Sequence, residues 1–165
     1  MKLYIKQKVF SWSDRFTIWD EQGNERWYGQ GEIFSWGRKL HVLNTGGQEV
    51  AFIRQKLLSF LQRYFIEINN HTYTFVKEFT FLKPRFHLEG IGWTASGDFW
   101  AHEYEVSNGS DCIMSLSKKW FTWGDSYELD IPNPENELLA LCVALTIDCM
   151  NADSANASSS GAANN

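Results

Sequence analysis

Residues 137–150 read Glu137-Leu-Leu-Ala-Leu-Cys-Val-Ala-Leu-Thr-Ile-Asp-Cys-Met150, and only Thr146 and Asp148 interrupt the apolar run that follows Glu137. A helix on the surface of a domain shows one apolar stripe, at a spacing of about 3.6 residues. Here the large apolar side chains point all round the helix axis: Leu138, Leu139, Leu141, Val143, Leu145 and Ile147. We therefore predict a helix at about residues 134–150 that the rest of the chain encloses on nearly every side.

The residues before this run are typical of a helix start. Asn133 suits the N-cap, Pro134 suits the first helical position, and Glu135 and Glu137 favour the positive end of the helix dipole. A membrane span is the alternative interpretation, but a span needs roughly 20 apolar residues and this run is much shorter. We therefore expect a core helix and no transmembrane segment.

The composition predicts one domain with a large core. The chain has 165 residues, of which 44% are hydrophobic and 16% aromatic. This length fits a single domain. The formal net charge of -5 produces no overall field that attracts nucleic acid or an anionic membrane, and we expect no nucleic-acid partner. Local basic clusters remain compatible with this net charge.

The N-terminus and the cysteines indicate a cytoplasmic protein. The first residues, Met1-Lys-Leu-Tyr-Ile-Lys6, are charged too early for a signal peptide and lack its apolar stretch. The cysteines are Cys112, Cys142 and Cys149. The last two are separated by roughly 10 Å of helical rise, which is too far for a disulfide. We expect reduced thiols.

Ahead of the helix, apolar residues recur at every second position, as they do in β-strands. The series are Leu3, Ile5 and Val9; Tyr64, Ile66 and Ile68; and Tyr73, Phe75, Phe79 and Phe81. Turn sequences such as Gln22-Gly-Asn24, Thr45-Gly-Gly47 and Asn108-Gly-Ser110 separate such runs. Short strands with turns of this kind predict an antiparallel meander, closed as a barrel or folded as a sandwich.

A weak internal repeat supports a regular series of hairpins. Lys6-Gln-Lys-Val-Phe-Ser-Trp12 resembles Arg54-Gln-Lys-Leu-Leu-Ser-Phe60 and Ser117-Lys-Lys-Trp-Phe-Thr-Trp123, and Glu32-Ile-Phe-Ser-Trp36 is a shorter copy. About six hairpins of this size, or roughly twelve strands, cover the chain up to Ile131. Either common ancestry or common hairpin chemistry explains the repeat.

The composition changes after Met150. Residues 151–165 contain no large apolar side chain. Such a segment cannot bury enough surface to offset the entropy lost on ordering. We therefore predict a single domain over residues 1–150 and a disordered tail over residues 151–165.

Four blocks of sequence carry a family resemblance. They are Lys6-Gln-Lys-Val-Phe-Ser-Trp-Ser-Asp-Arg-Phe16, Gln55-Lys-Leu-Leu-Ser-Phe60, Gly97-Asp-Phe-Trp-Ala-His-Glu-Tyr-Glu-Val106 and Ser117-Lys-Lys-Trp-Phe-Thr-Trp-Gly-Asp-Ser-Tyr127. These blocks resemble the bacterial branch of the LURP-one-related family, and the resemblance covers residues 1–150. That family is similar to the C-terminal domain of tubby proteins and to phospholipid scramblases. The resemblance implies an all-β, tubby-like fold of about twelve antiparallel strands, closed as a barrel around a buried C-terminal helix. It implies little biochemistry, because most bacterial members have no assigned activity. Tubby domains bind phosphoinositide headgroups through basic residues, but those residues do not align one by one with this chain.

The residues themselves predict no enzyme. His102 and Glu103 form the most enzyme-like pair, but neighbours on a strand face opposite sides and cannot act on one substrate atom. The histidines and cysteines lack metal-ligand spacing, and Gly29-Gln-Gly31 is not followed by a helix that would bind phosphate. Asp14 and Asp125 follow equivalent turns, where we expect them to bond turn amides; a shared metal site is the alternative. We expect no catalytic residue, cofactor or metal.

Basic residues at matching places in the repeat are the best functional candidates: Lys6, Lys8, Arg54, Lys56, Lys118 and Lys119. Residues two apart share one face of a strand, so a barrel could align these charges on its outside. One interpretation is an ordinary solvated face; the other is a site for an anionic headgroup or phosphate. The nearby Trp12, Trp36, Trp120 and Trp123 either enter a membrane interface or belong to the core.

Two functions from different classes agree with these patterns. The first is a non-enzymatic binding or signalling module that recognises an anionic lipid headgroup or a membrane surface, to which a cytoplasmic protein would attach peripherally. The second is a soluble protein-interaction or regulatory scaffold with a protein partner. The identity of the ligand or partner stays open.

Overall fold

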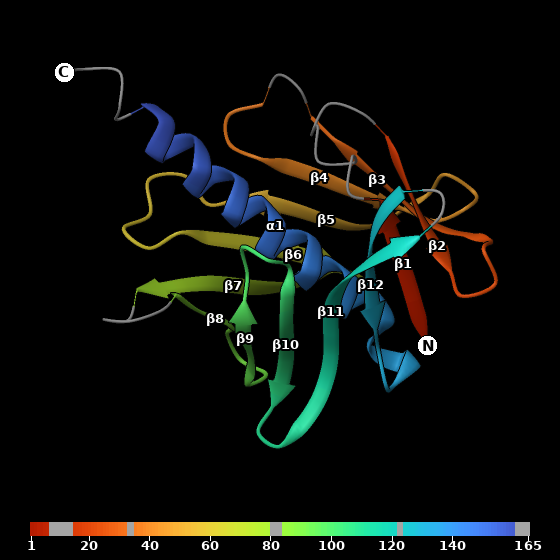
Figure 1. The fold of residues 1–165 in the computed structure, drawn as a ribbon. Helices are drawn as coiled ribbons and strands as arrows, with labels where there is room; N and C mark the ends of the chain where they lie inside the picture. Colours follow the sequence, from red (N-terminus) through yellow and green to blue (C-terminus); the bar gives the residue numbers. More distant parts are fainter. Residues whose placement is uncertain (7–14, 33–34, 80–83, 122–123, 161–165) are drawn as a thin grey trace.

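In the computed structural model of the chain, the strands form the wall of a closed barrel (Figure 1). Their alternating apolar side chains are buried and contribute to the core. The structure describes residues 1–6, 15–32, 35–79, 84–121 and 124–160. Its twelve strands pair antiparallel with their neighbours in the chain, and β1 also pairs with β12, with Leu3 opposite Leu129. This last pairing closes the sheet. The predicted barrel is therefore confirmed, and the sandwich alternative is wrong.

The elements follow one another with short connections. In chain order they are β1 (Lys2–Lys6), β2 (Phe16–Asp20), β3 (Glu25–Gly31), β4 (Lys39–Leu43), β5 (Glu49–Gln55), β6 (Arg63–Ile68), β7 (His71–Phe79), β8 (Pro84–Leu88), β9 (Trp93–Asp98), β10 (Glu103–Asn108), β11 (Asp111–Phe121), β12 (Gly124–Asp130), the 3₁₀-helix η2 (Pro134–Asn136) and α1 (Glu137–Ser160).

The helix α1 runs through the barrel and supplies much of its core (Figure 1). Its residues from Ala140 to Met150 are all buried, as the apolar run predicts. The start is also as predicted, because the Asn133 side chain accepts a hydrogen bond of 3.1 Å from the Glu135 amide and Pro134 follows it.

The helix does not end near Met150, so the predicted boundary is wrong. It continues to Ser160, and no glycine or proline interrupts it between Glu137 and Gly161. Asn151 is buried, and its amide donates a 2.9 Å hydrogen bond to the Phe99 carbonyl. Residues 151–160 are therefore helical and not the disordered tail that their composition predicted, whereas residues 161–165 lie outside the described part.

One glycine is required by the packing of the barrel wall. Gly29 on β3 lies opposite Phe16 on β2, and a Cβ atom at position 29 would come within 2.1 Å of the Phe16 ring. The Gly29-Gln-Gly31 segment is thus part of a strand, where Gly29 makes room for an aromatic ring.

Because neighbouring strands run in opposite directions, successive connections lie at opposite ends of the barrel. We call the end where α1 begins the start end, and the end where α1 emerges the exit end. At the start end, the Met1 amino group donates to the Ile131 carbonyl (2.9 Å) just before the helix begins. At the exit end, where α1 emerges, the odd-numbered strands end and the even-numbered strands begin. The described parts of the connections at this end include residues 35–38, 56–62 and 99–102.

A buried carboxylate holds the helix at the start end. Glu137 accepts two hydrogen bonds from the Arg26 guanidinium, of 2.8 and 2.7 Å, and one of 2.7 Å from the Trp27 indole. Burial acts to raise the pKa of Glu137, but these donors outweigh it, so the pKa is lowered overall. The charged form of Glu137 therefore stabilises the fold.

Leu141→Asp tests the enclosure of the helix. Leu141 is fully buried, so a carboxylate there would have no solvent and no designed partner, and we expect a loss of about 4 kcal/mol or more in the free energy of unfolding. Urea denaturation followed by circular dichroism measures it. The control Leu58→Asp changes a fully exposed leucine and should melt close to the wild type. If both variants melt alike, α1 is not enclosed.

Glu137→Gln tests the buried carboxylate through its pH dependence. A lowered pKa in the folded state means that the stabilisation is present above the unfolded pKa and is lost as the pH falls through the folded pKa. The stability difference between wild type and Glu137→Gln should therefore be constant near neutral pH and shrink in acid, below about pH 4.3. Denaturation midpoints across pH measure this. A difference that does not shrink in acid would contradict the assignment.

Candidate functional site

The exit end displays apolar side chains that the core does not use. Among the described residues, the large hydrophobic side chains that are exposed all lie in its connections, with relative exposures of 90% for Trp36, 46% for Leu57, 106% for Leu58, 102% for Phe60 and 61% for Trp100. Single exposed hydrophobic residues are normal on a protein surface, but here those of the described residues all occur at one end of the barrel. The exit end is therefore the first candidate site.

Two of these connections pack against each other. Gly37 has a φ of 79°, and a Cβ atom there would come within 2.8 Å of a Leu57 methyl group. The backbone amide of Arg38 donates to the side-chain oxygen of Gln55 (3.1 Å), and the backbone amide of Gln55 donates to the Arg38 carbonyl (2.8 Å). The residues 35–38 and the β5–β6 connection thus form one ordered unit.

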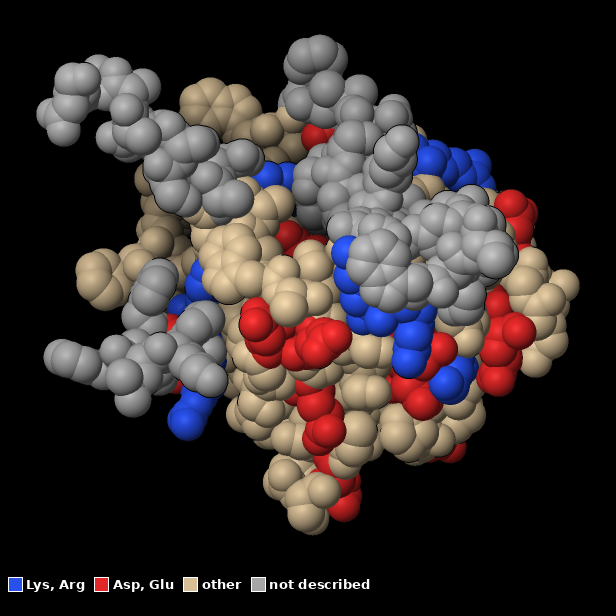
Figure 2. Space-filling model, viewed as in Figure 1, with Lys and Arg blue, Asp and Glu red and all other residues tan. Residues whose placement is uncertain are grey.

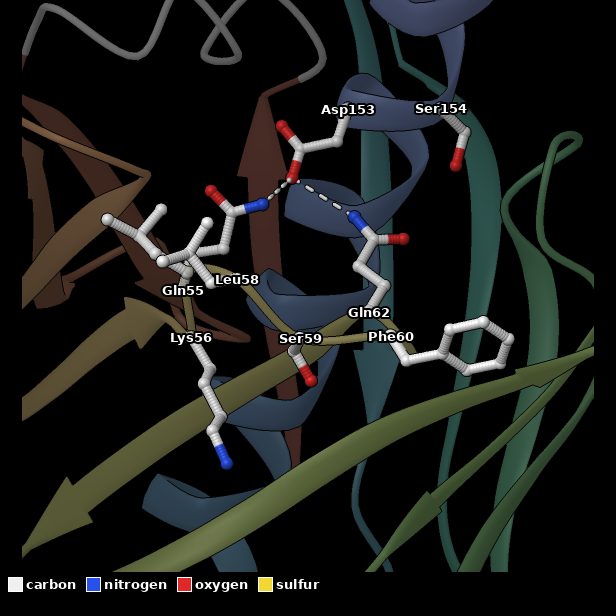
Figure 3. Close-up of a pocket in the computed structure, with 9 residues that line it drawn as sticks. Gln55, Lys56, Leu58, Ser59, Phe60, Gln62, Asp153 and Ser154 are labelled. Atoms are coloured by element: carbon white, nitrogen blue, oxygen red, sulfur yellow. Dashed lines mark hydrogen bonds between the residues drawn. The ribbon is translucent and has the colours of Figure 1, made fainter.

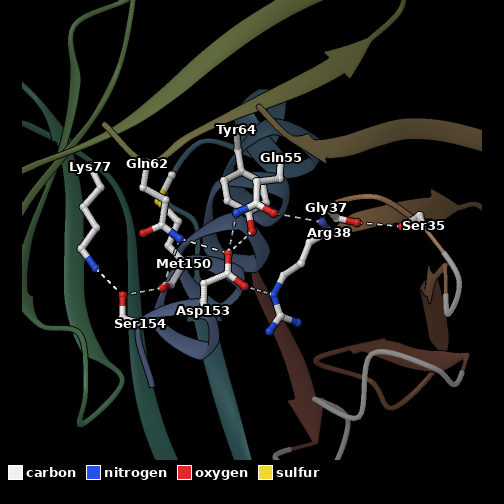
Figure 4. A network of polar contacts seen from close by, with 10 residues as sticks. All are labelled: Ser35, Gly37, Arg38, Gln55, Gln62, Tyr64, Lys77, Met150, Asp153 and Ser154. Carbon is white, nitrogen blue, oxygen red and sulfur yellow. Dashed lines mark hydrogen bonds and ion pairs between the residues drawn. The ribbon is translucent and has the colours of Figure 1, made fainter. Parts of the chain in front are cut away.

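A cluster around Asp153 ties this unit to the emerging helix (Figure 4). We call Asp153 with Arg38, Gln55, Gln62 and Tyr64 the Asp153 cluster. Its Oδ2 atom accepts from Gln55 (3.0 Å), Gln62 (3.0 Å) and Tyr64 (2.7 Å), and its Oδ1 atom pairs with Arg38. Burial raises the pKa of Tyr64 well above its ordinary value, so its hydroxyl remains a donor.

Next to this cluster, Lys77 reaches the helix from the inner wall of β7. Its ammonium group donates a 2.8 Å hydrogen bond to the Ser154 hydroxyl, which in turn donates to the Met150 carbonyl (2.9 Å). Burial lowers the pKa of Lys77, and the nearby Asp153 carboxylate acts in the opposite direction. Both polar side chains thus hold the same turn of α1 at the barrel mouth.

A shallow pocket of about 410 Å³ lies between the β5–β6 connection and the helix (Figure 3). Its walls include Leu57, Leu58 and Phe60 on the loop and Asp153 on the helix. The carboxylate is already occupied by four donors, so it offers little to a cationic ligand. The pocket therefore marks the junction of loop and helix, where the Asp153 cluster holds the loop.

The β9–β10 connection is also fastened to the helix. The Asp98 carboxylate accepts from the amides of Trp100 (3.1 Å) and Ala101 (2.9 Å), which closes the turn. His102 has a φ of 56° and lies before β10, not on a strand beside Glu103 as predicted. Its Nδ1 atom is 3.1 Å from Oδ1 of Asp148 on α1. Burial raises the pKa of Asp148 and His102 acts against this shift. This pair holds the connection to the helix.

Among the described side chains, the predicted basic residues lie in two separate places. Arg54 and Lys56 lie together, with their charged groups 4.5 and 5.8 Å from the centre of the Phe65 ring, and Arg54 pairs with Glu67 at 2.8 Å. Lys118 and Lys119 belong to β11, which stands on the opposite side of the barrel because five strands separate it from β5 in either direction. Binding of an anion by either pair stays a prediction.

The remaining candidates from the sequence lie partly outside the described residues. Lys8, Trp12, Asp14 and Trp123 are outside them. The backbone of Lys6 ends β1, but its side chain and those of Trp120 and Asp125 are also outside the described part. Among the described residues, no group of three or more His, Cys, Asp or Glu could hold a metal ion. Cys112, Cys142 and Cys149 are free thiols.

The barrel is electrically polarised along its axis. We count the charged residues whose side chains the structure describes, and assign each to the nearer end of its strand or connection, or, for α1, to the end where its ion-pair partner lies. The exit half holds ten basic and seven acidic side chains, a formal charge of +3. The start half holds two basic and eleven acidic side chains, a formal charge of -9. The basic residues of the exit half are Arg15, Arg38, Lys39, Arg54, Lys56, Arg63, Lys77, Arg85, Lys118 and Lys119. Its acidic residues are Glu32, Glu78, Asp98, Glu103, Glu105, Asp148 and Asp153.

This polarity resolves how an acidic protein can present a basic surface. Figure 2 shows Asp and Glu down to the lowest part of the visible face, whereas Lys and Arg lie above it, at the middle, top and left edge. Two of the acidic groups in the exit half, Asp148 and Asp153, are taken up by contacts with His102 and the Asp153 cluster. In the same way Arg54, Arg63 and Lys119 of the exit half pair with Glu67, Glu89 and Glu128, which the count places in the start half. The exit end therefore combines exposed apolar side chains with more basic than acidic residues.

The sequence matches the family model described as LURP-one-related over residues 1–148. This chain belongs to the LURP-one-related family. It is similar to the uncharacterized protein YxjI of Bacillus subtilis, with 40% identity over 149 residues that cover 90% of this chain and 92% of that protein. In fold it is similar to an X-ray structure of a protein from Arabidopsis thaliana, with a TM-score of 0.62, 18% identity and coverage of 91% and 90% of the two chains. At that identity the likeness concerns the fold alone.

Within the described residues of this family member, no helix is both long and apolar enough to span a membrane.

Several residues of the exit end were not predicted from the sequence. Leu58 and Phe60 were considered only as members of a repeat block, and Trp100 was not singled out. Asp153 lay in the expected tail. Only the absence of strict alternation in Lys56-Leu-Leu-Ser-Phe60 pointed to a connection.

Two truncations test the Asp153 cluster. A chain that ends after Ser154 keeps the contacts of Asp153 and Ser154, so its stability should stay close to that of the full chain. A chain that ends after Met150 leaves the Tyr64, Gln55 and Gln62 donors without their acceptor, which should cost about 1–3 kcal/mol or more. Urea denaturation measures both. Equal stability of the two truncations would show that the cluster does not hold the helix.

Proposed function

We propose that this LURP-one-related protein is a non-enzymatic binding module that docks on an anionic membrane surface with the exit end of its barrel. The observation that carries the proposal is the coincidence, at one end, of the exposed apolar side chains and the positive half of the molecule. An anionic membrane matches both features: its negative headgroups attract the basic residues, and the apolar layer beneath them accepts the exposed apolar side chains.

The energetics favour weak and reversible adsorption. Each Lys or Arg near an anionic surface contributes about 1 kcal/mol, and salt screens this contribution. Trp36 and Trp100 are the side-chain type that favours the interfacial layer. The negative start half would face the solution, which orients the molecule with its exit end towards the membrane.

The non-enzymatic part of the proposal rests on how the polar groups at this end are used. Asp153, the carboxylate nearest the pocket, accepts from Gln55, Gln62 and Tyr64 and pairs with Arg38. His102 is engaged with Asp148. These groups hold the structure of the exit end, which supports a docking role for it.

Cosedimentation with vesicles tests the proposal. The wild type should bind vesicles of mixed phosphatidylcholine and phosphatidylserine at low salt, lose this binding at high salt, and hardly bind pure phosphatidylcholine. Replacing Lys6, Lys8, Arg54 and Lys56 by Gln should abolish binding, because the variant loses four positive charges, those of Arg54 and Lys56 at the exit end among them.

A matched control changes the net charge equally at the start end. Thr45→Glu, Asn70→Asp, Thr72→Glu and Ser110→Glu alter exposed residues there and should leave vesicle binding largely intact. If the wild type binds no anionic vesicles at low salt, or if both fourfold variants behave alike, the membrane proposal is wrong and a protein-interaction scaffold becomes the better interpretation.

A further inference from the structure

The β5–β6 connection is the most exposed apolar segment of the exit end. Leu58 and Phe60 have relative exposures of 106% and 102%, so solvent surrounds them on nearly all sides. In Figure 3 the Phe60 side chain points to the opposite side from the Leu58 side chain and away from Asp153. They neither cover the core nor form one continuous apolar face.

This segment is nevertheless held in place at both of its ends. Gln55 and Gln62, which flank it, each donate to the same Oδ2 atom of Asp153 at 3.0 Å. The amide of Lys56 donates to the Arg63 carbonyl at 2.9 Å, which closes the base of the loop. The exposure of Leu58 and Phe60 is therefore a feature of an ordered loop.

The backbone of Leu58 is strained. Its φ of 55° lies in the left-handed region, which side chains other than Gly, Asn and Asp seldom adopt. Such strain persists where the surrounding structure imposes it and is frequent at segments that contact ligands. Here the Asp153 cluster and the Gly37–Leu57 contact supply that surrounding structure.

The charge of the segment favours an anionic occupant. From Arg54 to Arg63 the sequence is Arg-Gln-Lys-Leu-Leu-Ser-Phe-Leu-Gln-Arg, with three basic residues and no acidic one. Arg54 pairs with Glu67 on the neighbouring strand β6, and Arg63 pairs with Glu89 in the β8–β9 connection. Lys56 is exposed, and within the described residues no ion pair joins it to a carboxylate.

We propose that the β5–β6 connection is the insertion loop of the protein: Leu58 and Phe60 enter the apolar layer of an anionic membrane, Lys56 contacts the headgroups, and Asp153 holds the loop ready for insertion. This inference rests on the proposed membrane docking. A fluid apolar layer can enclose two side chains that point apart, whereas a protein partner would need a separate pocket for each. Asp153 is a positioning residue here, since it acts through Gln55 and Gln62.

The first experiment removes the apolar side chains. Leu58→Ser with Phe60→Ser should weaken binding to vesicles of equal parts phosphatidylcholine and phosphatidylserine by about tenfold or more, because both side chains lose transfer into the apolar layer. Trp100→Ala, in another exit-end connection, is the comparison and should weaken binding less. If the wild type binds but the double variant binds equally well, the insertion loop is wrong while membrane docking stands. If the wild type does not bind, both are wrong.

The second experiment reports the position of the loop directly. Leu58→Cys, in a Cys112→Ser background that removes the exposed thiol, is labelled with an environment-sensitive fluorophore. Its emission should rise several-fold and shift to shorter wavelength when the same vesicles are added. The same label at Thr45→Cys, at the start end, should not respond. A response at Thr45 equal to that at Leu58 would overturn the proposal.

The third experiment tests Asp153 through a readout that needs no membrane. Asp153→Asn keeps the size of the side chain but removes the charge and one of the two acceptor oxygens. Hydrogen exchange of amides in residues 56–62 should become faster than in wild type, while exchange in β9 and β10 changes little, and vesicle binding should fall. Unchanged exchange in the loop together with unchanged vesicle binding would show that Asp153 does not position it.

Discussion

The interior of the closed barrel and the all-round apolar helix depend on each other. Side chains of a barrel with about eight strands can fill its interior, but a wider barrel leaves a space that they cannot reach across. The twelve strands of this protein enclose such a space, and residues 140–150 of α1 occupy it. In these residues the helix has no polar face that could lie against water. The sheet must therefore close for this part of the helix to be buried.

Polar contacts at the two mouths of the barrel fix the helix along its axis. Glu137 receives donors from Arg26 and Trp27 at the start, and Asp153 receives donors from Gln55, Gln62 and Tyr64 at the exit. Both carboxylates lie where the barrel opens towards water, so their desolvation is partial and the donors can offset it. The same contacts join the helix to strands that are distant in the sequence.

The two ends of the barrel differ in exposed apolar side chains and in charge, and this difference links the architecture to the proposed surface function. The antiparallel meander sends alternate connections to the exit end, and the exposed apolar residues and most basic residues occur next to those connections. Asp153 on α1 accepts hydrogen bonds from both ends of the β5–β6 connection, so the position of the buried helix determines where this connection lies. Membership of the LURP-one-related family and the fold shared with the Arabidopsis protein are consistent with a scaffold whose connections carry the specific function.

The sequence alone determined the helix start, the alternating strands and the enclosed character of residues 138–150, because these follow from local spacing and capping. It did not determine the helix end, since residues 151–160 have no apolar periodicity and their order comes from contacts such as Asn151 with Phe99. Only the tertiary structure placed Arg54 and Lys118 on opposite walls, because strand order decides which basic residues become neighbours. It also decided that Leu58 and Phe60 are exposed. Apolar residues are usually expected in the core, but here they lie in a connection at the barrel mouth, where their side chains point into the solvent.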